Sequence, residues 1–238
     1  MNKLVFFDTE TTGNEQKDFL VQIAFKHEGE IFSGLYKPEI KIPPEASAVH
    51  HITNKMVADK PTFKESTDQP IIKKLFEAED SIVVAHNAPF DLMIIEKEDI
   101  KPQKFICTLR VARELDAEGK IARYNLQYLR YLLDLDVEAT AHDALGDVLV
   151  LEKLFERLKN KIIAEEKLSE EEALVKMVEI SSHPSLFRTI TFGKHNGKKI
   201  EDVAKTDRGY LEWLLAQKLE SGQMEEDWIY TLQHHLKK

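Results

Sequence analysis

Short apolar blocks separated by turn residues run through the first two thirds of the chain, and their period changes from two to about 3.6. Runs rich in β-branched and aromatic residues predict strands at residues 4–7, 21–25, 31–36, 82–85 and 105–108. Apolar residues at helical spacing predict helices at 53–57, 71–76, 92–95, 111–115, 126–133 and 147–158. Strands that alternate with helices after an initial hairpin predict an α/β fold, a mixed sheet flanked by helices.

The pattern changes near the end of the last of these helices. A glutamate-rich stretch with a narrow apolar stripe predicts a charged helical connector. Residues 190–200 then read as a strand, a tight turn at Asn196 and Gly197, and a return strand, and residues 210–215 read as an apolar helix with Asp207 as N-cap. The predicted organisation is a core of residues 1–160, a connector of residues 161–180 and a small α+β module of residues 181–238.

Acidic residues stand in three local frames, each at the end of a predicted strand or the start of a predicted helix. Asp8 and Glu10 follow the first strand and, two residues apart, point to the same face. Asp91 lies near a helix N-terminus and Asp147 opens another helical stripe. His142 precedes Asp147 by about 140° of helical rotation, so it is free to face a water molecule instead. Four carboxylates in one pocket would repel each other, so the set predicts a site for hard divalent cations.

Each frame also has a structural interpretation when taken alone. The segment from Asp8 to Gly13 is a plausible strand end and turn, Asp91 suits the first turn of a helix, and Thr140 with Asp143 could form a capping box. The occurrence of all three frames in order, with ligands of one chemical type, favours the metal site.

The ordered set resembles the DEDDh branch of the 3′→5′ exonuclease superfamily that includes proofreading exonucleases and ribonuclease T. The three frames are similar to its motifs Asp-x-Glu-Thr-Thr-Gly, His-Asn-x-x-Phe-Asp and His-x-Ala-x-x-Asp. The resemblance covers residues 1 to about 160 and implies a ribonuclease H-like fold. It further implies one cation on Asp8, Glu10 and Asp147 beside the attacking water, a second on Asp8 and Asp91 beside the leaving oxygen, and His142 as general base.

Two further segments bear on the substrate. Residues 48–53 are similar to the family's His-Gly-Ile-Thr stretch, with His51 in the place of the glycine. Residues 192–215 resemble the Phe-Gly-Lys-x-x-Gly-Lys and Gly-Tyr-Leu-x-Trp-Leu module of exodeoxyribonuclease X-like proteins, which favours DNA over RNA. The basic turn of this module is either a phosphate contact or a solvated tip. The candidate substrate-binding residues are Thr9, Thr11, Thr12, His50, Phe90, Lys194, Lys198 and Lys199.

Composition limits the cellular setting and the mode of binding. The net charge of −9 requires that a nucleic acid be bound through local basic patches, with strong salt dependence. The single cysteine excludes an intrachain disulfide and suits a reducing compartment. No apolar stretch approaches the roughly 18 residues of a membrane span and no export signal is evident, so we expect a cytoplasmic protein.

The sequence therefore predicts a metal-dependent 3′→5′ exonuclease that uses two divalent cations, Mg²⁺ or Mn²⁺. It would act on DNA, at single strands or frayed 3′ ends, and release nucleoside 5′-monophosphates. Two alternatives stay open: a 3′ exoribonuclease on the same fold, and a non-catalytic nucleic-acid-binding or polymerase-tethered subunit. A replication or repair protein is a further candidate partner, and the sequence leaves the oligomeric state open.

Overall fold

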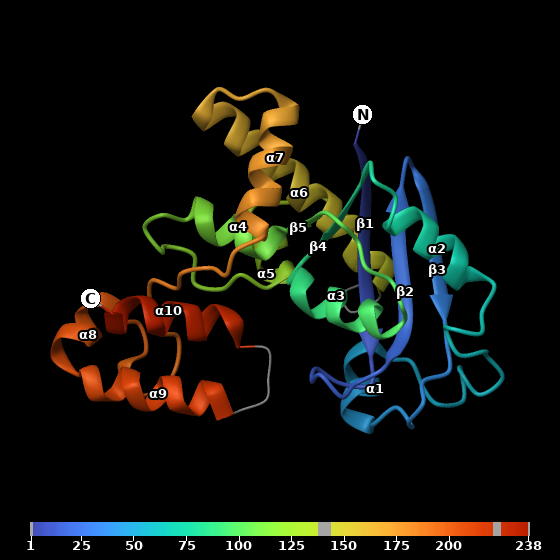
Figure 1. Cartoon of the computed structure of the whole chain (residues 1–238), viewed down its shortest axis with the longest axis horizontal. Helices are drawn as coiled ribbons and strands as arrows, with labels where there is room; N and C mark the ends of the chain where they lie inside the picture. The colour runs from blue at the N-terminus through green and yellow to red at the C-terminus, as the bar shows by residue number, and fades with distance from the viewer. Residues whose placement is uncertain (1, 138–143, 221–224, 238) are drawn as a thin grey trace.

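A mixed sheet forms the centre of the computed structural model, which describes residues 2–137, 144–220 and 225–237 (Figure 1). The strand order is β3-β2-β1-β4-β5. Strand β2 runs antiparallel to both of its neighbours, β3 and β1. Strand β4 runs parallel to β1, and β5 runs parallel to β4. The predicted mixed α/β sheet is confirmed. The strands are β1 Lys3–Thr11, β2 Leu20–His27, β3 Glu30–Leu35, β4 Ser81–Ala85 and β5 Phe105–Cys107.

Helices cover both faces of the sheet. One face packs against α2 (Asp68–Phe76) and α3 (Ala88–Lys97). The other face packs against the long helix α6, which contacts β1, β2 and β3. The helices on this second side are α4 Thr108–Leu115, α5 Leu126–Leu132, α6 Ala144–Glu166 and α7 Glu170–Ser181.

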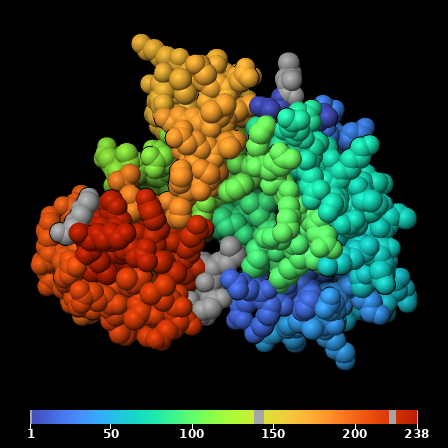
Figure 2. Space-filling view, viewed as in Figure 1, coloured from blue at the N-terminus to red at the C-terminus, as the bar shows by residue number. Residues whose placement is uncertain are grey.

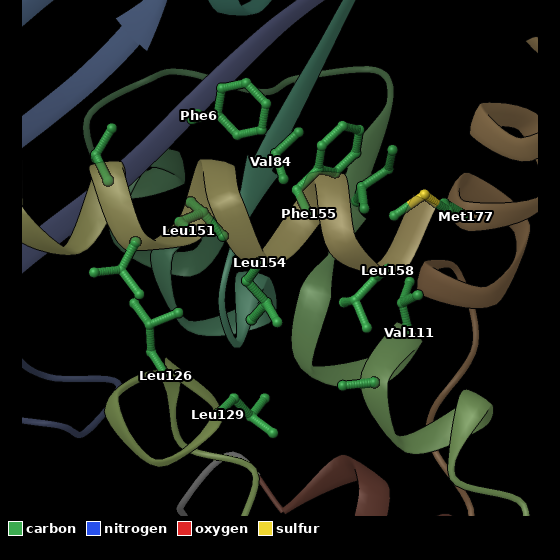
Figure 3. Close-up of a cluster of buried hydrophobic side chains, with 14 of the residues drawn as sticks. Phe6, Val84, Val111, Leu126, Leu129, Leu151, Leu154, Phe155, Leu158 and Met177 are labelled. Carbon is green, nitrogen blue, oxygen red and sulfur yellow. The ribbon is translucent and has the colours of Figure 1, made fainter. Parts of the chain in front are cut away.

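Alternation along β1 sends successive side chains into two separate cores. Phe7 packs edge-on against Phe76 of α2 at 5.1 Å between ring centroids. Phe6 points the other way and packs edge-on against Phe155 of α6 at 5.2 Å, in the cluster that Figure 3 shows. Burial of each phenylalanine side chain stabilises the folded protein by about 1.5–3 kcal/mol. A shift of one residue would exchange the two sets, so both cores fix the register of β1.

The segment after β3 differs from the prediction of a helix at 53–57. The helix there is α1, Pro44–His50, and residues 54–59 form turns. Proline suits the first helical turn, because its missing N–H group would have no partner there. Ile52 and Val57 are buried in a small cluster with Val21. The turns of residues 54–59 place Val57 in this cluster without a helix.

The predicted boundary at residue 160 falls within α6, which continues to Glu166 because its apolar stripe continues through buried Ile162. After a turn, α7 begins at a capping box of Ser169 and Glu172. The buried side chains of α7 belong to the same core cluster as α6. The acid-rich stretch is therefore packed on the core of residues 1–160.

Within its described residues, the C-terminal module contains the helices α8 Ile200–Thr206, α9 Arg208–Glu220 and α10 Glu226–Lys237. The predicted strand pair is reduced to one β-bridge between Thr189 and Lys199, with a short 3₁₀ turn between them. The reason is tertiary: His195 within this turn is buried and its Nε2 lies 2.8 Å from Asp207 Oδ2. Helix α10 had not been predicted.

Ion pairs dock this module on α4. Arg110 is bonded to Glu226 at 2.7 Å and lies 3.4 Å from Asp227. Arg113 pairs with Asp227 at 2.5 Å, and its guanidinium lies 4.4 Å from the ring centroid of Phe187. Figure 1 shows the module as a separate lobe whose helix α10 faces the rest of the molecule. Across the parts of the chain that the structure describes, no helix is long and apolar enough to cross a membrane.

Candidate active site

Three carboxylates meet where β1 extends past the end of β4. Asp8 and Glu10 come from β1 and Asp147 from the first described turns of α6, and their oxygen atoms lie within 4.8 Å of one another. β4 pairs with β1 only as far as Phe6, so the two acids of β1 lie beyond the carboxyl end of that strand. Phe6, Asp8 and Glu10 alternate onto the same face, the face that α6 covers.

This donor set fits a divalent cation. Carboxylates this close repel each other when all are ionised, and oxygen-only ligands are those that Mg²⁺ and Mn²⁺ prefer. Asp8 and Glu10 are half-buried and Asp147 is buried, so the cluster opens toward solvent from one side. Asp8, Glu10 and Asp147 thus form an acidic cluster that could hold a metal ion.

Asp91 lies beside this cluster but is attached from the other face of β1. Its Oδ1 accepts hydrogen bonds from the backbone N–H of Thr9 at 3.1 Å and from Thr9 Oγ1 at 2.6 Å. Thr9 stands between Asp8 and Glu10 and points to the α3 side of the sheet. Burial raises the pKa of Asp91 to about 7, although both bonds from Thr9 favour the ionised form. Since Oδ1 accepts both bonds, Oδ2 takes part in neither.

Helix α3 begins at Ala88, so Asp91 lies in its first turn. Asn87 adopts the left-handed conformation with φ 67°, a region that asparagine tolerates better than most residues. Pro89 and half-buried Phe90 follow, and the N–H group of Phe90 donates to the carbonyl of Asn87 at 2.9 Å. His142, the predicted general base, lies outside the described residues.

The predicted substrate residues near β1 make bonds within the protein. Thr12 Oγ1 donates to Asp18 at 2.9 Å. The Nδ1 of His50 accepts from the N–H of Ile52 at 3.0 Å, so its Nε2–H donates to the carbonyl of Thr11 at 3.2 Å. Burial lowers the pKa of His50, which matches this neutral tautomer. These bonds fix the end of β1, and direct contact of these residues with substrate stays a prediction.

His51 occupies the position of the family's glycine and adopts the conformation that glycine favours. It ends α1 with φ 62° and ψ 9°, and its N–H group bonds to the carbonyl of Ser47. A left-handed residue at this position is the usual way to end a helix. The local backbone thus keeps a glycine-like shape despite the substitution.

The three lysines predicted in the C-terminal module lie in different settings. Lys194 pairs with Asp207 at 2.7 Å and lies 5.0 Å from the ring centroid of Tyr210. Lys198 and Lys199 are exposed, and no ion pair to either is found within the described ranges. The predicted phosphate contact therefore rests more on these two lysines than on Lys194.

Sequence reasoning missed a partner of Asp147. Gln127 Nε2 donates to Asp147 Oδ1 at 2.6 Å, and Arg130 Nη1 donates to Gln127 Oε1 at 3.3 Å. Both residues lie on α5, whose N-cap Asn125 accepts from the N–H of Tyr128. A single glutamine on a predicted helix carries no pattern that could have revealed this contact.

His86 of the second motif also had no assigned role. Its Nε2 donates to the carbonyl of Tyr124 at 2.7 Å, and its Nδ1 lies 2.9 Å from Thr108 Oγ1. Desolvation by the surrounding protein lowers the pKa of His86 to about 4, so the ring is neutral near pH 7. It ties the end of β4 to the loop that precedes α5.

A mixed five-stranded sheet with helices on both faces and an acidic cluster beyond β4 has the architecture of a ribonuclease H-like nuclease. The family model for the ribonuclease T type, described as exonuclease, matches residues 5–155, and the chain belongs to this family. A second model, exodeoxyribonuclease X-like C-terminal, matches residues 190–218. The resemblance predicted from the motifs is confirmed.

Relatives match the chain over nearly its whole length. Exodeoxyribonuclease 10 of Escherichia coli K12 is 34% identical over 241 residues, which cover 98% of each chain. DNA polymerase III subunit epsilon of Haemophilus influenzae is 28% identical and 93% of each chain is covered. The solved structure of exonuclease X in complex with 5′ overhanging duplex DNA has a TM-score of 0.59 and 29% identity, covering 75% of this chain and 99% of that one.

Proposed function

We propose that this protein is a 3′→5′ exonuclease that hydrolyses phosphodiester bonds of DNA. The acidic cluster of Asp8, Glu10 and Asp147 at the end of β1 carries the proposal. Membership of the exonuclease family supports it, as does similarity over 98% of the chain to a protein named exodeoxyribonuclease. The expected products are nucleoside 5′-monophosphates.

Two divalent cations, Mg²⁺ or Mn²⁺, would polarise the scissile phosphate and lower the pKa of the attacking water. Asp8, Glu10 and Asp147 would hold one of them, and Asp8 with Asp91 would hold the other. Thr9 orients the Asp91 carboxylate and Gln127 orients that of Asp147. His142 is proposed to accept the proton of the water, because an imidazole with a pKa near 6.5 suits this task at neutral pH.

DNA is proposed as the substrate, at single strands or frayed 3′ ends. A related solved structure holds 5′ overhanging duplex DNA. The match of residues 190–218 to the exodeoxyribonuclease X-like C-terminal model supports the same choice. Phe90, half-buried in the first turn of α3 next to Asp91, is a candidate to stack on the terminal base.

Digestion of end-labelled oligonucleotides tests the proposal. Single-stranded DNA, duplex DNA and RNA of one sequence are incubated with Mg²⁺, and the products are resolved by length. We expect a 5′-blocked DNA strand to be shortened and a 3′-blocked strand to resist. Faster removal of ribonucleotides would identify an exoribonuclease instead, and no product from any substrate with Mg²⁺ or Mn²⁺ would favour a binding subunit.

Asp8→Asn provides the control for the metal site. It should lower kcat by several orders of magnitude, since the substitution removes a carboxylate proposed to serve both cations. The fold should be kept, because Asp8 is only half-buried and asparagine has nearly the same shape. Circular dichroism and thermal unfolding verify the fold, and a fully active Asp8→Asn protein would refute the metal assignment.

A further inference from the structure

Two adjoining cavities lie between the C-terminal module and the exonuclease domain. The larger has a volume of about 970 Å³ and the smaller about 430 Å³. Figure 2 shows a hollow between the two parts of the molecule on one face. The cavities adjoin, because they share lining residues, and we name the two together the intermodule channel. The shared residues are Asn87, Leu109, Arg113, Phe187 and Trp228.

The smaller end of the channel reaches the catalytic motifs. It is lined by Asn14, which follows the turn at the end of β1, and by Asn87, Pro89 and Phe90, which lead into the helix that carries Asp91. A strand whose 3′ end lay at the acidic cluster could therefore enter the channel within a short distance of the scissile bond. The channel thus borders the proposed active site at Phe90, which precedes Asp91 in the chain.

Charge along the channel favours an anionic occupant. The three acids at the smaller end are neutralised, Glu225 by Lys218, Glu226 by Arg110 and Asp227 by Arg113. The larger end is lined by Arg123 and Arg188, both exposed, and neither has an ion-pair partner among the described residues.

The one carboxylate at the larger end, Asp116, has partners of its own. It accepts from the hydroxyl of Tyr124 at 2.6 Å and from the backbone N–H of Ile121 at 2.8 Å. Two arginines are therefore available to phosphates.

The wall of the channel is held in place before any ligand binds. His86 bonds to the carbonyl of Tyr124, which fixes the loop that carries Arg123. On the opposite wall, Phe187 packs edge-on against Trp228 at 4.5 Å. Arginines interleaved with aromatic rings along a groove are the pattern of single-strand binding, in which phosphates meet the cations and bases stack on the rings.

We infer that the intermodule channel binds the single-stranded stretch of DNA that lies upstream of the 3′ nucleotide in the active site. The inference rests on the proposed function and assigns the C-terminal module to substrate binding through Arg188, Phe187 and Trp228. It also accounts for the ion pairs that dock the module on α4.

Binding measurements in excess chelator test this without turnover. The full-length protein carrying Arg123→Ala and Arg188→Ala is compared with Arg157→Ala, which removes an exposed arginine of α6 that does not line the channel. Each single-strand phosphate contact contributes about 0.7 to the slope of log affinity against log salt. We expect the double variant to lower that slope by about 1.4 for a twelve-nucleotide strand and to weaken binding about 25-fold at 0.1 M salt.

A fluorescence measurement locates the strand. The chain has two tryptophans, so Trp213→Phe leaves Trp228 as the only reporter, on the channel wall. The twelve-nucleotide strand should quench it, and a dinucleotide should not. Unchanged affinity in the double variant, an equal loss in Arg157→Ala, or no quenching would overturn the inference. Equal weakening for blunt duplex DNA would overturn the assignment to a single strand.

The proposed function has a separate readout. Hydrolysis of the dinucleotide with Mg²⁺ depends on the acidic cluster and far less on the channel, so the loss in the double variant should grow with strand length. If the wild-type protein binds the long strand through the channel but cleaves no substrate, the exonuclease proposal is wrong and the assignment of DNA binding to the channel is kept. If the wild-type protein cleaves short strands while the double variant binds long strands with normal affinity, the inference about the channel is wrong and the exonuclease proposal is kept.

Discussion

At the scale of single residues, the informative position is Asp91, a carboxylate buried against the strand that carries two other acids. Its pKa of about 7 exceeds the ordinary value near 3.8, so the fold without metal favours the protonated form. The stability that this protonation provides is present below pH 3.8 and is lost as the pH rises through 7. The metal-free protein should therefore lose stability across that range.

Thermal unfolding of wild type and Asp91→Asn between pH 4 and 8 measures this loss. Asparagine can accept both bonds from Thr9 without carrying a charge. In chelator at pH 8 we expect Asp91→Asn to unfold roughly 5 °C above wild type. Mn²⁺ should stabilise the wild type and narrow the difference. Parallel pH curves for the two proteins in chelator would show that burial of Asp91 is not the cause.

Gln127 is the second residue whose role can be tested alone. Removing the 2.6 Å bond to Asp147 frees that carboxylate to rotate, and loss of such a supporting partner typically costs 10–100-fold in metal affinity. We expect Gln127→Ala to lower Mn²⁺ affinity by roughly that factor in calorimetric titration, with kcat partly recovered at high Mn²⁺. Gln217→Ala, an exposed glutamine of α9, is the matched control. Equal affinities for the two variants would leave Gln127 without a positioning role.

The sequence indicated the acids but not the residues that hold them. Asp8 and Glu10 are two residues apart on a strand, and period two is enough to place them on one face. The contact of Gln127 with Asp147 spans 20 residues and joins two helices, and no local pattern encodes such a pair. The same holds for Thr9, whose bond to Asp91 spans 82 residues.

At the scale of elements, prediction succeeded where burial against the two main cores decides the pattern. The central strands β1 and β4 send alternate side chains into both cores, and the helices α2 to α6 bury apolar positions at helical spacing. Prediction failed where tertiary contacts override the local pattern. Residues 190–200 have strand-like composition, yet the burial of His195 against Asp207 bends them into a 3₁₀ turn. The turn of residues 54–59 is similarly fixed by its small cluster.

The end of α1 gives a prediction at this scale. His51 has a left-handed backbone, which costs roughly 1–2 kcal/mol for residues with a Cβ atom and most for β-branched ones. His51→Val should therefore lower the free energy of unfolding by about 1–2 kcal/mol relative to His51→Gly, as measured by urea denaturation. His27→Val, at a position in β2 with ordinary extended backbone, is the control. A valine as stable as glycine at 51 would mean that the helix end relaxes.

At the scale of the whole molecule, the ion pairs between α4 and α10 decide whether the two parts act together. The Arg110 side chain is 5% exposed, so a lost partner would leave its charge buried and poorly compensated. Asp227 pairs with both Arg110 and Arg113 and also accepts from the N–H of Ser185. We expect Asp227→Ala to destabilise the protein by on the order of 3 kcal/mol.

Limited proteolysis checks this prediction. The module should detach in Asp227→Ala and expose residues 182–189 to cleavage, whereas Asp202→Ala, an exposed acid of α8, should leave the digestion pattern unchanged. An Asp227→Ala protein that resists protease as wild type does would show that apolar contacts alone hold the two parts together.

The alternation of β1 limits how this protein can change over evolutionary time. Phe6 and Phe7 fill opposite cores, Asp8 belongs to the acidic cluster, and Thr9 binds Asp91 on the other side of the sheet. One short stretch of coding sequence therefore specifies both the cores and the site. Insertion or deletion of a single codon there would exchange apolar and acidic side chains between the faces at once. Neutral drift in β1 is therefore confined to substitutions, whereas loops at the sheet edges, such as Glu28 to Gly29, are free to vary in length.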